Sequence, residues 1–284
     1  MTGCLSTRWR HLWKNIDHLI LDTHNFGMQE PQLSDYHENP HFWNTEATKF
    51  VHKILEFDFC DSLLSVGIHA DKLLRFVYKG HKINIGYEYA PILHQLYVYF
   101  VKKNECPLDF ISALPKLPKL EMLVLQFPER LQVSRALQHT VRFAGLTAIV
   151  LSLLKSWKES ICSLAYLLKA APLVEYFGLH GCSELQQPIE LNITWPEDFT
   201  LARLYTIIIR GFSGESELME LLYFLLRRTT VLEMLQMETR AKEPRHVKLL
   251  RHQSEDATRC PYAREMALTH LGPKVPPTVK FSVT

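Results

Sequence analysis

The sequence predicts an α/β solenoid, and two features of the 284-residue chain lead to this prediction. The first is the pattern apolar-x-x-apolar-x-apolar, which occurs seven times, with steps of 20, 27, 26, 28, 30 and 28 residues between successive starts. The second is helical periodicity in segments between the copies. The copies begin at Leu73, Leu93, Leu120, Leu146, Val174, Leu204 and Leu232. Repeats of about 20–29 residues with this pattern are leucine-rich repeats.

We therefore expect an irregular leucine-rich-repeat solenoid, with a parallel sheet on one face and helices and loops on the other. The competing interpretation is an ordinary α/β or α+β domain in which the matches arise by chance. Leucine-rich repeats usually carry Asn or Cys eight residues after the first apolar residue, and only Cys182 fits here. Because the ladder of asparagines that satisfies the turn backbone is missing, the repeats should be irregular.

Each copy of the pattern predicts one short strand. Its last two apolar residues lie two positions apart and face the same side, which becomes buried when the strands stack. The residue between them faces the opposite side, which is concave in a solenoid. Because these residues are more apolar than a solvated surface would be, we expect them to be partly covered or to bind a partner. The candidate partner site is Tyr97, Val124, Val150, Ile208 and Gln236, with Val77 and Gly178 at equivalent positions.

Helices are predicted between the strands. Apolar residues at i, i+3, i+4 and i+7 predict helices over 161–168 and 218–225, and similar spacing predicts a helix over 47–55. The loop Gly211–Gly214 would lead into the second helix, with Ser213 or Gly214 as its cap.

Composition limits the classes of function. The net charge is only +2, so the whole chain offers no electrostatic case for binding nucleic acid or a membrane surface. No apolar run reaches the ~18 residues that a membrane-spanning helix needs. The six cysteines are far apart and form no C-x-x-C pair, which favours free thiols in the cytoplasm or nucleus.

We find no residues whose spacing indicates catalysis. Phosphate-binding glycine loops are absent from the sequence, and Gly211–Gly214 lacks the spacing of a nucleophile elbow. His180 and Cys182 have no second pair at ligand spacing. The prediction is a protein that is not an enzyme and has no catalytic, cofactor or metal site.

The N-terminal residues carry a specific motif. Residues 4–13 read Cys-Leu-Ser-Thr-Arg-Trp-Arg-His-Leu-Trp, which resembles the second half of a plant F-box. The positions that match are Leu5, Ser6, Arg8, Trp9, Arg10, Leu12 and Trp13. Residues 73–80, 143–179, 205–237 and 263–283 also resemble the plant F-box/LRR-repeat (FBD-like) family. On this basis we expect a partial, helical F-box over 1–22, a polar linker over 23–45, and a leucine-rich-repeat domain over 46–284. That domain would have a polar surface loop over 240–262 and a final strand that caps the sheet.

The resemblance implies a role in protein interaction. Proteins of this family are substrate-recognition subunits of SCF-type E3 ubiquitin ligases, whose F-box binds a Skp-type adaptor and whose repeats select a protein substrate. Because the sequence begins within the F-box pattern, a second interpretation stays open. It is a leucine-rich-repeat scaffold, or a degenerate family fragment, that does not bind the adaptor.

Overall fold

The computed structural model describes the chain in segments. They are residues 18–22 (backbone), 54–58, 65–81, 83–100, 111, 114–127, 143–153, 161–181, 195–196, 199–239 and 261–284. Every structural statement below concerns these residues.

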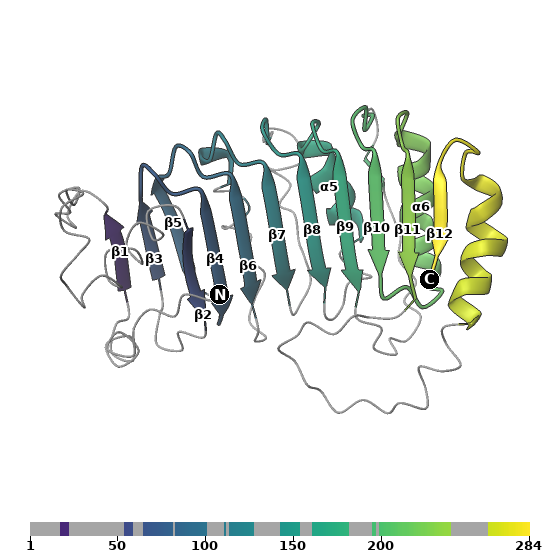
Figure 1. Cartoon of the computed structure of the whole chain (residues 1–284), viewed down its shortest axis with the longest axis horizontal. Coiled ribbons are helices and arrows are strands. Elements are labelled where there is room, and N and C mark those ends of the chain that lie inside the picture. Colours follow the sequence, from purple (N-terminus) through teal and green to yellow (C-terminus); the bar gives the residue numbers. More distant parts are fainter. Residues whose placement is uncertain are drawn as a thin grey trace, which may run out of the picture.

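A nine-stranded parallel sheet runs along the molecule (Figure 1). Its order is β12-β11-β10-β9-β8-β7-β6-β4-β2, and every neighbouring pair is parallel. Each of the seven predicted strands is present. The strands are β2 (Ile54–Asp58), β4 (Arg75–Gly80), β6 (Gln95–Phe100), β7 (Met122–Phe127), β8 (Ala148–Leu153), β9 (Tyr176–Gly181), β10 (Thr206–Arg210), β11 (Met234–Glu238) and β12 (Lys280–Val283).

The side of this sheet that faces the core is the side that the repeat pattern predicts. The last two apolar residues of each pattern are at most 2% exposed, which confirms the assignment of the buried face. A parallel strand buries such residues by stacking on its neighbours, so the core runs along the whole solenoid. These residues are Phe76, Tyr78, Leu96, Val98, Leu123, Leu125, Ile149, Leu151, Phe177, Leu179, Ile207, Ile209, Leu235 and Met237.

A second parallel sheet backs the N-terminal repeats and was not predicted. It has the order β1-β3-β5, formed by His18–Asp22, Ser65–His69 and Asn84–Tyr89. Val66 and Ile68 of β3 point into the core, as do Ile85 and Tyr87 of β5. Here each repeat contributes one strand to each of two facing sheets.

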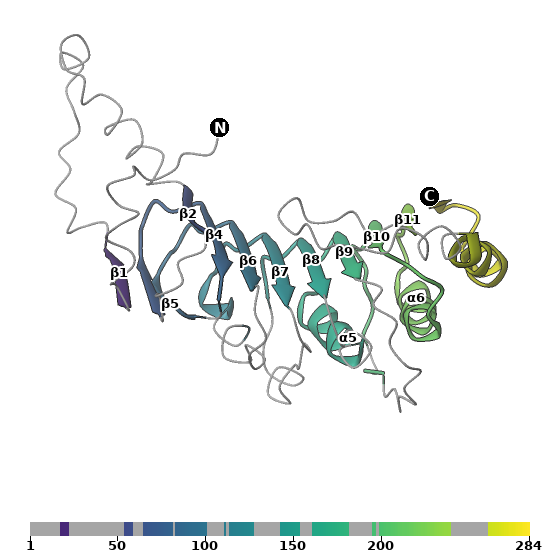
Figure 2. The same ribbon diagram turned by 90° about the horizontal axis from the view of Figure 1, so that it is seen from below.

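Helices back the C-terminal repeats, as predicted. α5 (Ile161–Ala170) and α6 (Ser216–Arg228) pack their leucine-rich sides on the sheet. Figure 2 shows the sheet as an arc, with both helices on its convex side. Three shorter elements complete the fold: η3 (Leu114–Lys116), the π-helical turn η5 (Ala267–Leu271) and η6 (Gly272–Lys274). None of the described helices is long and apolar enough to cross a membrane.

A backbone ladder orders the turns that lead into the strands. The carbonyl of the residue after the first apolar residue accepts two N–H groups from the next repeat. For example, the Glu121 carbonyl accepts the N–H groups of Thr147 and Ala148, each at 2.9 Å. The same arrangement recurs at Leu74, His94, Thr147, Glu175 and Tyr205. These turns are satisfied by main-chain groups, so their order needs no asparagine at this end of the strands.

The C-terminal residues close the sheet, as expected. β12 pairs with β11, and helical residues 261–266 continue into η5 beside it (Figure 1). Arg264 Nη1 donates a hydrogen bond to the Val283 carbonyl on β12. A cationic side chain at this place discourages pairing with another strand. Of the predicted surface loop 240–262, only residues 261 and 262 are described, and they are helical rather than part of a loop.

Three expectations were wrong or only partly met. Ile54 and Leu55 belong to strand β2 rather than to a helix, because the edge of β4 offers hydrogen-bonding groups that outweigh helical spacing. The N-cap of α6 is Glu215, whose carboxylate accepts hydrogen bonds from the N–H and hydroxyl of Ser213. His18–Asp22, placed within the helical F-box remnant, is strand β1, paired with β3. Leu5–Trp13 and the linker over 23–45 lie outside the described residues.

Candidate protein-interaction face

The side of the nine-stranded sheet that faces away from the helices is the candidate site. In-register pairing places its outward residues in three rows that cross the strands. The predicted site residues share the middle row, so the structure brings all five together. In strand order from β4 to β11, this row is Val77, Tyr97, Val124, Val150, Gly178, Ile208 and Gln236.

The middle row is partly covered by its own neighbours. Val124 is 9% exposed, while Tyr97, Val150 and Ile208 are half-buried. A Cβ at Gly178 would lie 3.2 Å from the Tyr176 ring and 3.3 Å from a Val150 methyl group. These two side chains therefore fill the space that the missing side chain leaves. The apolar surface of the middle row therefore continues past Gly178 without a large gap.

The first row, at the N-terminal ends of the strands, contains a positioned arginine. Arg75 Nε donates a hydrogen bond to Gln95 Oε1 at 2.6 Å. The Arg75 guanidinium carbon lies 5.6 Å from the centre of the Tyr97 ring, which is a cation–π distance. The Tyr97 hydroxyl in turn donates to the sulfur of Met122 at 3.2 Å. This chain of contacts holds a half-buried guanidinium against an aromatic ring.

The third row, at the C-terminal ends of the strands, is polar, and sequence reasoning missed it. It lies one position after the last apolar residue of each pattern, so the same alternation could have identified it. Three of its members take part in ion pairs: Lys79 pairs with Glu56 of β2 at 3.5 Å, and Arg210 pairs with Glu238 at 3.2 Å. The row is Lys79, Tyr99, Gln126, Ser152, His180, Arg210 and Glu238.

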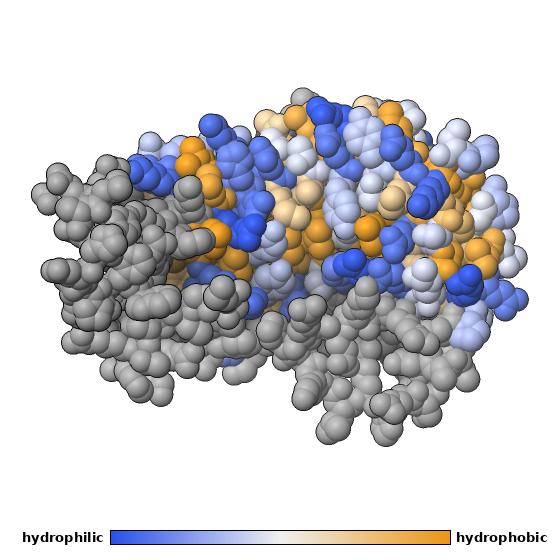
Figure 3. Space-filling view, viewed as in Figure 1, coloured by the Kyte–Doolittle hydropathy of each residue, from blue (hydrophilic) through white to orange (hydrophobic). Residues whose placement is uncertain are grey.

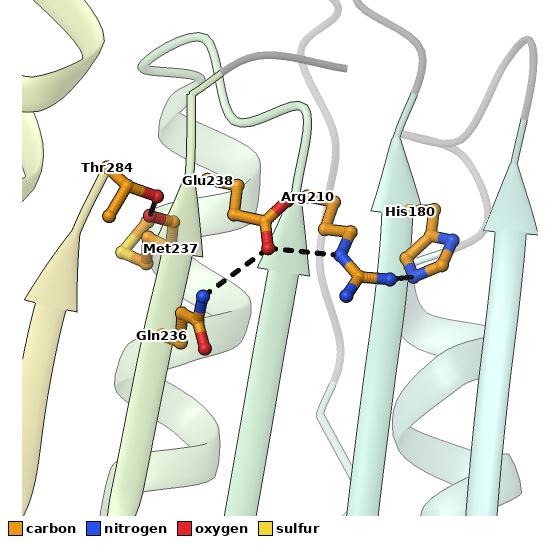
Figure 4. A network of polar contacts seen from close by, with 6 residues as sticks. All are labelled: His180, Arg210, Gln236, Met237, Glu238 and Thr284. Atoms are coloured by element: carbon orange, nitrogen blue, oxygen red, sulfur yellow. Dashed lines mark hydrogen bonds and ion pairs between the residues drawn. The ribbon is translucent and has the colours of Figure 1, made fainter. Parts of the chain in front are cut away.

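Figure 4 shows the most connected part of the third row. Arg210 Nη1 lies 2.9 Å from His180 Nε2, and Gln236 Nε2 donates to Glu238 Oε1 at 3.3 Å. Burial, assisted by the charge of Arg210, lowers the pKa of His180 to about 4. His180 is therefore neutral near pH 7. Because an arginine can only donate, Nε2 accepts and the proton resides on Nδ1.

The middle of this face carries no formal charge. Twelve outward positions on β6, β7, β8 and β9 hold neutral residues once His180 is neutral, although 22% of the whole chain is charged. We call these positions the uncharged centre. Arg75 and Lys79 border it on β4, and Arg210 and Glu238 border it beyond β9. Figure 3 shows patches of apolar residues on this face, interspersed with hydrophilic residues. The uncharged centre is Gln95, Tyr97, Tyr99, Met122, Val124, Gln126, Ala148, Val150, Ser152, Tyr176, Gly178 and His180.

This arrangement is suited to binding. His180 points at a guanidinium rather than at a hydroxyl or thiol, so it is not arranged to activate a nucleophile. The described residues hold no group of three His, Cys, Asp or Glu side chains that could bind a metal ion. The F-box pattern, Leu5–Trp13, lies outside the described residues.

A comparison with protein-family models matches residues 51–284 to the family described as "At1g61320/AtMIF1, LRR domain", named for a plant protein. The match covers most of the chain and includes strands β2 to β12 in full, while β1 lies before it. Searches among curated proteins and among solved structures found no match.

Proposed function

We propose that this chain, which belongs to the At1g61320/AtMIF1 LRR-domain family, is a protein-binding scaffold that serves as the substrate-recognition subunit of an SCF-type ubiquitin ligase. The observation that carries the binding part is the uncharged centre of the sheet face. The ligase part rests on the F-box-like residues Leu5–Trp13. In this role the protein is a non-catalytic subunit without a cofactor, located in the cytoplasm or nucleus. Its partners are proteins rather than nucleic acid or a membrane.

The composition of the face supports a protein partner. The centres of protein interfaces are depleted in charge and enriched in tyrosine and methionine, with polar groups around them. Tyr97, Tyr99, Tyr176 and Met122 lie in the uncharged centre. Charged residues lie on β4 at one side and on β10 and β11 at the other. This is the arrangement of an interface centre with a charged rim.

The size of the face also supports a protein partner. Nine strands spaced about 4.8 Å apart, each about 17–20 Å long, give a face of roughly 700 Å². Specific protein interfaces bury about 600–1,000 Å² on each partner, and the face lies within this range. The face is therefore large enough for a specific complex, whereas a small ligand would need a concave pocket of suitable depth.

Binding of the adaptor is tested on the full chain, co-expressed with a Skp-type adaptor and analysed by size-exclusion chromatography. The expected result is a complex that is lost in the double variant Trp9→Ala/Trp13→Ala. His11→Ala is the matched control, because position 11 is not part of the F-box pattern, and it should leave the complex intact. A folded native chain that elutes without the adaptor would refute the ligase role and leave the scaffold without adaptor binding.

Binding through the face is tested separately, by comparing the proteins that co-purify from plant cells with native and variant chains. Tyr97→Glu and Ile208→Glu should each remove the same partner. The control Tyr205→Glu changes an exposed aromatic residue on the turn before β10, outside the three rows of the face, and should retain that partner. Thermal unfolding verifies that all variants fold. Equal recovery from all four chains would contradict binding through the face.

A further inference from the structure

Arg75 differs from the other cations on the sheet face. Its in-register neighbours are Ile54 on β2 and Gln95 on β6, neither of which is acidic. Its contacts are the hydrogen bond from Nε to Gln95 and the ring of Tyr97. Within the described part of the chain, its two terminal nitrogens make no hydrogen bond. They form the end of the guanidinium fork, the geometry that binds a carboxylate through two parallel hydrogen bonds.

The remaining cations on this face are either paired or unrestrained. Lys79 lies 3.5 Å from Glu56, and Arg210 lies 3.2 Å from Glu238. Lys280 is exposed on β12, at the far edge of the sheet. Arg75 alone among these four is both held in place and without a carboxylate. An arginine that stacks on a tyrosine at the border of an apolar centre is typical of an interface residue with a large contribution to binding.

Two hydroxyl groups indicate the form of the partner. Tyr99 and Ser152 lie in the third row on either side of Gln126, and their hydroxyls make no hydrogen bond within the described part of the chain. A helix has few free main-chain groups to offer them, because its N–H and C=O groups bond to each other. An extended segment keeps its main-chain groups free.

We propose that the face binds an extended protein segment that places a carboxylate on Arg75 and an apolar side chain on Val124 and Val150. This proposal rests on the proposed function, since it specifies the partner of the same face. From β4, strands β7 and β8 are two and three strands away, or about 10–14 Å. An extended chain covers that distance in about three or four residues. The recognised segment is therefore an Asp or Glu separated by three or four positions from a large apolar residue, without further charge between them.

The test uses a random-peptide display library as the probe, selected on the immobilised full chain and counter-selected on Val150→Glu. Selected peptides should be enriched in an acidic residue at the expected distance from an apolar residue. Arg75→Gln should then weaken binding of a selected peptide roughly ten- to hundredfold, the range for a hydrogen bond to a charged group. Lys280→Gln, an exposed cation on β12 at the far edge of the sheet, is the control and should change binding less than about twofold.

A second measurement separates the anchor from a folding effect. Exchanging the peptide carboxylate for an amide should weaken binding to the native chain but not to Arg75→Gln, and Arg75→Lys should bind with intermediate affinity. Peptides that bind the face but tolerate Arg75→Gln would overturn the acidic anchor and leave the proposed function standing. If no selected peptide distinguishes the native chain from a folded Val150→Glu, both the anchor and binding through the face are refuted, while the adaptor experiment decides the ligase role independently.

Discussion

The N-terminal and C-terminal repeats share one sheet but are backed differently. The strand-backed repeats, residues 65–100, place β3 and β5 opposite β4 and β6. The helix-backed repeats, residues 143–239, place α5 and α6 in the corresponding position. The pattern that forms the main sheet is the same in both regions. What differs is the step between copies: 20 residues in the first region against 28 to 30 in the second.

The length of the step decides the backing. A five-residue strand spans about 17 Å at about 3.3 Å per residue. An α-helix needs about eleven residues for that distance, at about 1.5 Å per residue. α5 and α6 have 10 and 13 residues, whereas β3 and β5 have 5 and 6. A 20-residue step leaves room only for the strand, while a longer step leaves room for a helix.

The backing also changes what the core contains. Between the two sheets the core is rich in aromatic side chains, with ring centres 5.9 Å apart in Phe57 and Phe76 and 6.1 Å apart in Tyr78 and Phe100. The buried Tyr78 hydroxyl donates to the His81 carbonyl at 2.6 Å, so it is satisfied. Behind the C-terminal strands the core consists mainly of leucines from the helices. A helix is about 10 Å wide, whereas neighbouring strands lie about 4.8 Å apart. The helices therefore take up more length along the solenoid than the strands do, and the helical side becomes the longer, convex side of the arc.

The largest expected effect compares the two cores directly. Phe76 and Phe177 are both fully buried, one in each region. Phe76→Ala and Phe177→Ala should each lower the free energy of unfolding by about 3–5 kcal/mol. Because repeats contact mainly their neighbours, hydrogen exchange should show lost protection mostly in the region of the substitution. Uniform loss of protection along the whole chain would mean that the regions unfold as one unit.

A proline in α6 tests whether the helix-backed region depends on its helix. Glu220 is an exposed position within α6. Glu220→Pro should cost about 3 kcal/mol, because proline removes a helical hydrogen bond and its ring clashes with the preceding turn. Urea unfolding measures this, with Glu220→Ala as the control, expected within about 0.5 kcal/mol of the native chain. A proline variant as stable as the control would show that the helix contributes little.

Two glycines near the C-terminal cap should respond differently to alanine. Gly214 has φ +91°, and a Cβ there would lie 2.8 Å from the Tyr262 ring. Gly214→Ala should therefore cost about 1–3 kcal/mol and loosen the last helix from α6. At Gly272, with φ −48°, the nearest side-chain atom would lie at an ordinary 3.7 Å from the new Cβ. Gly272→Ala should change the free energy of unfolding by no more than about 0.5 kcal/mol, and calorimetry of both variants measures the difference.

The smallest expected effect depends on pH and involves the third row. The folded pKa of His180, about 4, lies below its ordinary value of about 6.5. The unfolded chain therefore binds this proton at a higher pH than the folded chain. The stabilisation is fully present above about pH 6.5 and is lost as the pH falls toward 4. Because the side chain is partly exposed, we expect a loss of only about 1–2 kcal/mol.

Unfolding by urea at several pH values measures this contribution. His180→Gln should flatten the dependence of stability on pH between 6.5 and 4. Ser152→Ala, in the same row and without a group that titrates between pH 6.5 and 4, serves as the control and should leave the native dependence unchanged. If His180→Gln retains the native slope, other groups cause it.

Several features could be read from residues alone. Seven strands, their buried faces, both long helices and the final strand followed from spacing, because a side chain's direction in a strand or helix depends on its position in the repeat. The middle row of the face followed for the same reason. Strands β3 and β5 were missed although Val66-x-Ile68 and Ile85-x-Tyr87 have alternating spacing, because two apolar residues are too few to separate a strand from a turn. The N-cap of α6 was missed because Glu is not among the residue types preferred at N-caps, whereas Ser and Gly are.

The repeat spacing was sufficient to establish the solenoid and which side chains are inside, since both follow from distances along the chain. Every contact between side chains of neighbouring strands depends on how one repeat pairs with the next, which the sequence alone does not specify. Three properties of the face depend on contacts between residues that lie 20 to 30 positions apart in the sequence. They are the neutral state of His180, the stacking of Arg75 on Tyr97 and the uncharged centre. Register brings such residues within a few ångströms, and a register shift of one residue would turn each side chain to the other face. The scaffold could therefore be predicted from the sequence, whereas the properties of its binding face arise only when the strands are aligned.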